Sequence, residues 1–511
     1  MRARDGWWGV VGLVAGAALL RTPSIVGAPD ASWDEDTFIL VAQRLAMGEL
    51  PFTTTFENKP PLFSVLLALP QLVAPDSRLA VRLTLAAVII LTALLVQAVV
   101  RRATGSSLAG TLAGLIVAGV SALAPSGQAW MSQHSANLWL AVLLLLLRGE
   151  RSRPGRSALT GVVAATLVLT RTNYVIPAAA LLLLRVLRRP PSERPAALAW
   201  LFAGGAIPVA AVLVVYGLAG ELPALLAGVF EILVADGGQG DLRAGLRLPP
   251  PWLASTAGLL VVLGAAAWSR GEGTDEGART LWWAGILLAL FMGVSVLLHQ
   301  SIFTHYLLMF AVPLAVLGGL AANAIRQDLV APHRSGPVRR RNWASAAVRM
   351  GLPLIAAAVL ARPAGLDPAR LVSDLEGREQ ELHDDVVGTL EQFLADRPGP
   401  VWALTDHYVY WRTGTLPPHP LVTHPSSLVK PEFWASVPMD DTIRPTTFRE
   451  AIDLILATEP RYVVGTERLD EWYLDRLPQG DRAHLAQHLD REYPIVWRST
   501  SDIVIRERLP I

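Results

Sequence analysis

Residues 33–83, WDEDTFILVAQRLAMGELPFTTTFENKPPLFSVLLALPQLVAPDSRLAVRL, join two apolar stretches of the chain. The whole connection, near 27–77, is about 50 residues long, and connections of that length are usually functional or disordered. It carries acids at its start, apolar residues at helical spacing and a Lys-Pro-Pro motif, so its composition is not that of a disordered segment. We therefore expect an ordered, functional loop.

The composition of the 511 residues indicates a membrane protein. Hydrophobic residues make up 52% of the chain and charged residues 17%, against roughly 25% charged residues in a typical soluble domain. The mean hydropathy is +0.40, and a single soluble core could not bury so much apolar surface. Cysteine is absent, which excludes disulfides, thiolate metal sites and thiol nucleophiles.

Eleven apolar stretches are long enough, or nearly so, to cross a hydrocarbon core, which requires about 20 helical residues. They lie near 7–26, 78–99, 107–124, 136–148, 158–172, 174–187, 197–218, 252–268, 280–298, 302–322 and 346–362. The first could be a cleaved signal peptide, but the ten stretches behind it favour an uncleaved anchor. The sequence predicts an α-helical polytopic membrane protein with about 11 transmembrane helices.

The arginines predict the orientation of these helices. Every arginine-rich loop falls on one side of the predicted membrane, which the positive-inside rule makes cytoplasmic. These loops contain Arg2 and Arg4, Arg101 and Arg102, Arg148 to Arg156, Arg185 to Arg194, Arg270 and Arg279, and Arg326 to Arg341. The net charge of +1 therefore arises because the arginine-rich loops on one side nearly cancel the acidic segments on the other side. We expect a multi-pass cell-membrane protein with a cytoplasmic N-terminus and an extracytoplasmic C-terminal segment.

The predicted domains are a transmembrane module, 1–362, and a small extracytoplasmic α/β domain, 363–511. Within this module, the predicted topology puts the loops near 27–77 and 219–251 on the extracytoplasmic side of the membrane. In the C-terminal domain, periodicity predicts helices over 367–397, 447–458 and 468–490, strands over 401–404 and 462–464, and a hairpin over 494–508. An aromatic cluster in this domain could stack on sugar, although packing is the favoured explanation; it consists of His407, Tyr408, Tyr410 and Trp411.

Two helices are predicted within the first outer loop. Ser32-Trp33-Asp34-Glu35 reads as a capping box and Gly48 as the end of the first helix. Its apolar residues, from Phe38 to Leu45, share one face, as expected for a helix in the membrane interface. A second helix is expected from about Leu62 to Val73, with the next span beginning near Arg78.

The polar residues of this loop allow a structural and a functional interpretation. Asp34, Glu35 and Asp36 could all serve helix capping, since acids in a first turn favour the helix dipole, but capping does not require Asp34. Lys59 could be an interfacial lysine, yet the chain has only two lysines and otherwise uses arginine. An ammonium before Pro60-Pro61 suits a contact with phosphate. Both interpretations stay open on these residues alone.

The loop resembles the first periplasmic loop of the GT-C membrane glycosyltransferases. The nearest pattern is that of glycosyltransferase family 39, the aminoarabinose transferase of lipid A and the protein O-mannosyltransferases. That pattern comprises an Asp-Glu pair, a helix-ending Gly, Lys-Pro-Pro and an Arg in the next span, here Asp34-Glu35, Gly48, Lys59-Pro60-Pro61 and Arg82. Residues 299–319, HQSIFTHYLLMFAVPLAVLGG, also look like the late His-Tyr motif of the family, here His305 and Tyr306.

The resemblance implies inverting sugar transfer from a polyprenyl-phosphate donor on the outer face of the membrane. Asp34 and Glu35 would be the pair of acidic residues in the catalytic site. Asp34 would act as the general base that removes the proton of the acceptor. Lys59 and Arg82 would hold the lipid phosphate, which is also the leaving group. The implied partners are the donor, an envelope glycolipid, glycan or protein acceptor of a bacterial cell, and the bilayer; no nucleic acid is expected.

The sequence departs from the family pattern in the loop before the fourth span. That loop, GQAWMSQHSANLW (127–139), lacks the second acid that the family often has and offers Gln133, His134 and Asn137 instead. His134 is a candidate for the acceptor side. A tyrosine common after the Asp-Glu pair is Phe38 here.

Other ionisable residues lie near the predicted outer ends of spans, where they could anchor the helices or belong to the site. Arg82 is favoured as a site residue, Arg171 and His305 with Tyr306 are candidates for donor-phosphate binding, and His299 is undecided. A divalent cation near the acids is conceivable, but no ligand spacing supports one.

Two other classes of function predict different sequence features. A transporter or lipid flippase predicts inverted repeats or broken helices with midplane charges, and the sequence shows neither. A non-catalytic membrane protein would leave Asp34 and Lys59 unexplained. Among enzymes, a ligase or polymerase would use a pyrophosphate donor and a large late loop, whereas here the large loop comes first.

Overall fold

The computed structural model describes residues 2–26, 33–57, 59–123, 128–147, 153–231, 276–298, 304–330, 378–405, 407–434, 437, 444–471, 473–500 and 502–509. Contacts divide the chain into two compact units. Unit 1 consists of Met1–Ile25, Arg82–Ala211 and Gly240–Leu371, and unit 2 of Val26–Val81, Val212–Gln239 and Val372–Ile511. The predicted domain boundary at 362/363 lies outside the described residues and stays a prediction.

The first outer loop opens unit 2 with two helices, as predicted. Helix α2 (Trp33–Ala46) is followed by Gly48 at φ +95°, and α3 (Pro61–Val73) begins directly after Pro60. Helix α4 (Arg78–Thr104) starts at the expected residue. Ser32 of the predicted capping box lies outside the described residues. The buried surface of α2 extends beyond its apolar face, because α3 and α19 (Tyr408–Thr413) pack against it and residues 35–43 are all buried.

The C-terminal segment contains a four-stranded sheet of order β1-β2-β4-β3. Strands β1 (Val401–Ala403) and β2 (Tyr462–Thr466) are parallel, whereas β4 (Ile503–Glu507) is antiparallel to both β2 and β3 (Ile495–Arg498). The helices of this segment are α18 (Arg378–Asp396), α19, α20 (Pro431–Trp434), α21 (Phe448–Leu456) and α22 (Gln479–Glu492). Strands and hairpin lie where the sequence predicts them.

One predicted helix of this segment was wrong in its first half. We expected a helix over 468–490, but α22 begins only at Gln479. Leu469 has φ +52°, which an α-helix cannot contain, and a short 3-10 helix, η9 (Leu474–Arg476), follows it. Pro478 then occupies the N-cap of α22. By contrast, α21 starts as expected, with a capping box between Thr447 and Glu450.

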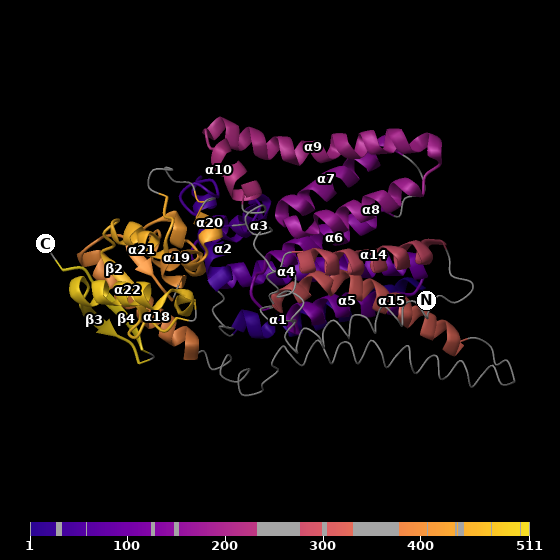
Figure 1. Ribbon diagram of the computed structural model, residues 1–511. Coiled ribbons are helices and arrows are strands. Elements are labelled where there is room, and N and C mark those ends of the chain that lie inside the picture. Colours follow the sequence, from indigo (N-terminus) through magenta and orange to yellow (C-terminus); the bar gives the residue numbers. More distant parts are fainter. Residues whose placement is uncertain are drawn as a thin grey trace. The chain divides into compact units, whose positions relative to one another are not determined.

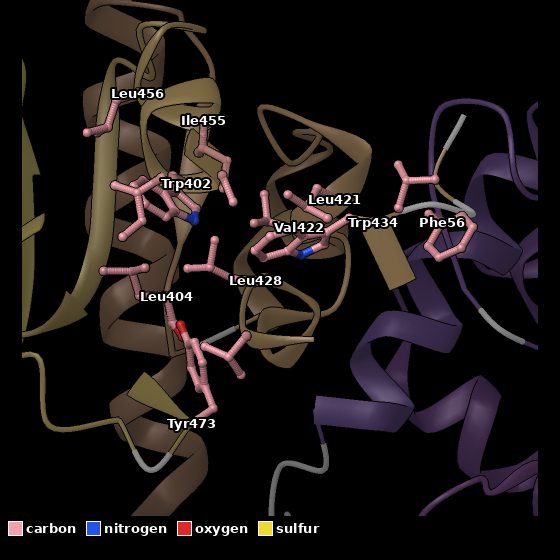
Figure 2. Close-up of a cluster of buried hydrophobic side chains, with 14 of the residues drawn as sticks. Phe56, Trp402, Leu404, Leu421, Val422, Leu428, Trp434, Ile455, Leu456 and Tyr473 are labelled. Atoms are coloured by element: carbon pink, nitrogen blue, oxygen red, sulfur yellow. The ribbon is translucent and has the colours of Figure 1, made fainter. Parts of the chain in front are cut away.

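The hydrophobic core of unit 2 draws on three separate stretches of the chain. Phe52 and Phe56 come from the first outer loop, and Tyr216 comes from the end of α9 (Arg194–Ala219). Most of the remaining side chains come from the C-terminal segment, including Trp402 and Trp434 (Figure 2). Because residues so distant in sequence share one core, the outer loop and the C-terminal segment form one folded body.

The described part of unit 1 consists of helices and the turns that connect them (Figure 1). Its helices are α1 (Arg2–Val26), most of α4, α5 (Ser107–Leu123), α6 (Ser132–Leu147), α7 (Pro154–Thr170), α8 (Val175–Leu187), most of α9, α14 (Glu276–Leu298) and α15 (Ala311–Val330). Helix α15 packs against α5 and α14, and α14 packs against α8. Every predicted span within the described residues falls in helical structure.

Five helices of the described chain are long and apolar enough to cross a membrane. They are Trp7–Ile25, Arg78–Thr104, Pro191–Ala219, Gly277–Ser295 and His305–Ala324, and four shorter apolar helices accompany them. The predicted spans at 252–268 and 346–362 lie outside the described residues, so the count of eleven stays a prediction.

Helices α7 and α9 touch through their backbones. A Cβ atom on Gly161 would clash with the carbonyl oxygen of Leu201, and one on Gly204 would clash with that of Ala158. Small residues allow helices in membranes to approach closely enough for extensive van der Waals contact. Glycine at these two positions therefore sets the distance between the helices.

We predict that Gly161→Ala lowers the thermal unfolding midpoint in detergent, because the added methyl group must push α9 away. Overpacking of this kind costs about 1–3 kcal/mol. Gly155→Ala on the same helix is the control, since a Cβ there meets nothing within 4 Å. Equal midpoints for the two variants would contradict the close approach.

Candidate functional site

Three acids occupy the first turn of α2, and only one of them is accessible. The side chain of Asp34 is 34% exposed, whereas Glu35 and Asp36 are each 1% exposed. The partial positive charge of a helix N-terminus favours carboxylates at all three positions. Asp34 is therefore the acid of this turn that a substrate can reach.

The Asp34 carboxylate contacts a histidine from the C-terminal segment. Nε2 of His424 lies 3.1 Å from Oδ1 of Asp34. His424 is the N-cap residue of a short 3-10 helix, η7 (Pro425–Val429), and its Nδ1 accepts hydrogen bonds from the backbone N–H and faces the hydroxyl of Ser426. The local backbone thus aims the histidine ring at Asp34.

Asp36 belongs to a buried network that ties the loop to α19. Arg78, the first residue of α4, pairs with its Oδ1 at 2.9 Å, and the indole N–H of Trp411 donates to the same oxygen. The Arg78 guanidinium lies 4.4 Å from the centroid of the Tyr408 ring, a cation–π distance. The aromatic cluster of the C-terminal segment is fully buried here, which confirms packing as its explanation.

Lys59 lies over the same face of α2 that carries Asp34. Its Nζ is 5.2 Å from the centroid of the Phe38 ring and 2.8 Å from Oε1 of Glu57. Phe38 follows Asp34 by four residues, and side chains four apart share one face of a helix. The structure therefore brings Asp34 and Lys59 to one helix face, with Glu57 holding the lysine.

A second group of predicted residues gathers within unit 1. Arg171 donates to the hydroxyl of Ser132, the first residue of α6, and lies 5.2 Å from the centroid of the Tyr306 ring. His305 packs edge-on against Tyr306, with 5.0 Å between centroids. His134 is buried in the same first turn of α6. The late His-Tyr pair, Arg171 and the start of α6 therefore meet.

Arg82 lies in unit 1 beside Arg21, a second arginine within a predicted span. Both Arg82 and Arg21 donate to the carbonyl oxygen of Gln128, the latter at 2.7 Å, and both side chains are buried. Buried positions are not those of interfacial anchors, whose charged ends reach water. An arginine inside an apolar span is itself a signal of function, and this signal identifies Arg21.

His424, like Arg21, was not predicted as a site residue. The sequence pattern around it is a less specific indication of function than an arginine within an apolar span. The sequence repeats His-Pro at His419-Pro420 and His424-Pro425, and each histidine caps a short helix with its own ring nitrogen. Nothing in the sequence links either motif to Asp34. His299 lies outside the described residues. Within the described part of the chain, no group of three or more His, Asp or Glu side chains could hold a metal ion.

The fold resembles that of solved glycosyltransferase structures. The crystal structure of ArnT from Cupriavidus metallidurans bound to undecaprenyl phosphate superposes with a TM-score of 0.58 and 15% identity, covering 99% of this chain and 98% of ArnT. ArnT is an aminoarabinose transferase of the GT-C type. The chain therefore has the GT-C fold, which confirms the fold that the loop motifs predicted.

A second structure is more distant. Archaeal oligosaccharyltransferase AglB from Archaeoglobus fulgidus, in complex with an inhibitory peptide and a dolichol-phosphate, gives a TM-score of 0.49 at 11% identity, over 99% of this chain and 75% of AglB. No protein-family model and no curated protein matches the sequence.

We predict that His407 makes unit 2 sensitive to acid. Burial lowers its pKa from 6.5 to about 3. Between the two pKa values, His407 binds a proton in the unfolded chain but not in the folded protein. The free energy of unfolding is therefore unaffected above about pH 6.5 and decreases as the pH falls toward 3, by up to about 1.4 kcal/mol per pH unit.

Thermal midpoints between pH 7 and about 4 test this expectation. His407→Phe should flatten the decline, whereas His484→Phe, at a partly exposed position in α22, should not. Equal slopes in all three proteins would rule out the contribution of His407.

Proposed function

We propose that this protein transfers a sugar from a polyprenyl-phosphate donor to an envelope acceptor on the outer face of the membrane. The observation that carries the proposal is the accessible Asp34 carboxylate on the same face of α2 as Lys59. The GT-C fold supports it, since the ArnT structure with that fold is bound to undecaprenyl phosphate. The N-terminus would then be cytoplasmic and the C-terminal segment extracytoplasmic.

In the proposed reaction an acceptor oxygen attacks the anomeric carbon of the donor. The bond between that carbon and the phosphate oxygen breaks, its electron pair leaves with the carrier phosphate, and a single displacement inverts the configuration. Asp34 takes the acceptor's proton, which general-base catalysis requires to be within hydrogen-bond reach. Glu35 lies in the same turn but is buried, so we assign the base to Asp34 and a supporting role to Glu35.

Cationic side chains would stabilise the charge that develops on the departing phosphate. We assign this role to Lys59, whose ammonium is held by Glu57 and lies over Phe38. Arg82, Arg171, His305 and Tyr306 keep the donor-phosphate role implied by the motifs. Arg171 supports this assignment, because a hydroxyl and an aromatic face hold its guanidinium without neutralising its charge. We keep His134, at the start of α6, for the acceptor side.

We predict that Asp34→Asn reduces transfer about 100- to 10,000-fold, the usual contribution of a general base, without weakening the binding of undecaprenyl phosphate. The measurement uses purified protein, a panel of undecaprenyl-phosphate pentoses and hexoses, and envelope extract as acceptor, and follows the release of undecaprenyl phosphate. Asp475→Asn, at a highly exposed carboxylate, is the control. Wild-type turnover in Asp34→Asn would exclude Asp34 as the base.

We predict that Lys59→Ala raises the Kd for undecaprenyl phosphate about 10- to 100-fold, because a hydrogen bond to a charged group contributes about 1.5–3 kcal/mol. Lys59→Arg should recover part of this affinity. Lys430→Ala is a matched control, since Lys430 is the only other lysine of the chain. An unchanged Kd in Lys59→Ala, with an unchanged thermal midpoint, would remove Lys59 from the phosphate site.

A further inference from the structure

The hydrogen bonds around His424 determine which ring nitrogen carries its proton. On one side, Nδ1 lies 3.3 Å from the backbone nitrogen and 2.9 Å from the hydroxyl of Ser426. On the other side, Nε2 lies 3.1 Å from Oδ1 of Asp34. A backbone N–H can only donate, so Nδ1 must accept and carries no proton.

A histidine with a bare Nδ1 is neutral and carries its single proton on Nε2. Nε2–H then donates to Oδ1 of Asp34, and Asp34 must accept through that oxygen. His407, 6.4 Å away between ring centroids, is kept neutral by burial and adds no positive charge behind the ring.

We propose that His424 is the positioning residue of the base: its Nε2–H holds Oδ1 of Asp34, so that the proton of the acceptor goes to Oδ2. The inference rests on the proposed function and adds a residue of the C-terminal segment to it. A hydrogen bond to one carboxylate oxygen fixes the rotation of the group, and a misplacement of about 1 Å can cost about 100-fold in rate.

Capping of η7 alone does not account for this arrangement. His419 caps η6 (Pro420–Val422) in the same way, with Nδ1 accepting from the backbone N–H of Leu421 at 3.1 Å. The two histidines thus perform the same local task. His424 differs in that its second nitrogen reaches an accessible carboxylate 390 residues away in sequence.

Two substitutions separate the two contacts of His424. In His424→Gln, the amide nitrogen replaces Nε2 and can still donate to Asp34, but the cap is lost. In His424→Asn, the side-chain oxygen replaces Nδ1 and keeps the cap, but the side chain is too short to reach Asp34. We expect His424→Asn to lower kcat about 100-fold with little change in KM, and His424→Gln to retain most of the wild-type kcat.

His419→Asn is the control for capping, and His484→Asn is the control for an exposed His–Asp pair, since Nε2 of His484 lies 2.7 Å from Oδ1 of Asp453. Both should keep wild-type kcat. Wild-type kcat in His424→Asn overturns the inference, as does a loss shared equally by His424→Gln and His424→Asn. If Asp34→Asn is inactive while His424→Asn is fully active, the positioning role of His424 is contradicted and the proposed function is not. If Asp34→Asn is active, the proposed function itself is contradicted.

A spectroscopic measurement tests the tautomer without any turnover. In protein labelled with ¹⁵N-histidine, the His424 signals, assigned by their loss in His424→Gln, should show a bare Nδ1 and a protonated Nε2. In Asp34→Asn the signal of Nε2 should shift. A protonated Nδ1 in the wild-type protein would overturn the inference whatever the kinetics show.

Discussion

The largely buried ion pair between Asp36 and Arg78 is the constraint on which the structure of unit 2 depends. Burying two charges costs more than their attraction returns unless further groups satisfy them. Here the indole of Trp411 donates to the same Asp36 oxygen, and the Tyr408 ring covers the guanidinium. Since these aromatics come from α19, the pair forms properly only when the first outer loop and the C-terminal segment fold together.

This constraint also explains the unequal acids of α2. The same first turn presents three carboxylates, yet burial removes Glu35 and Asp36 from solvent and leaves Asp34 accessible. Asp36 fixes the helix against α19, two residues from Asp34. The rigid attachment of α2 thereby positions the accessible carboxylate, which is what a functional group on a helix requires.

The sequence predicted local features better than distant pairings. Gly48, Pro60 and Pro61 mark the ends of α2 and α3 because each residue restricts the backbone where it stands. The first half of the helix predicted over 468–490 was wrong, because Leu469 has a positive φ. The packing of a turn determines such a φ, and hydrophobic periodicity does not reveal it. Asp34 and Lys59 were selected by motif, and the structure places them on one helix face. Their catalytic roles stay a proposal.

His424 shows why the rest of the candidate site could not be predicted from the sequence. Its contact with Asp34 joins residues that lie 390 positions apart in the sequence, and the His-Pro motif around it fits capping equally well at His419. The shared core of unit 2, which packs Phe56 of the loop with side chains of the C-terminal segment, helps to bring residues 420–429 close to α2. The backbone N–H of Phe56 donates to the hydroxyl of Thr423 at 3.0 Å, next to His424. The C-terminal segment is thus part of the structure that holds Asp34, rather than an appendage to it.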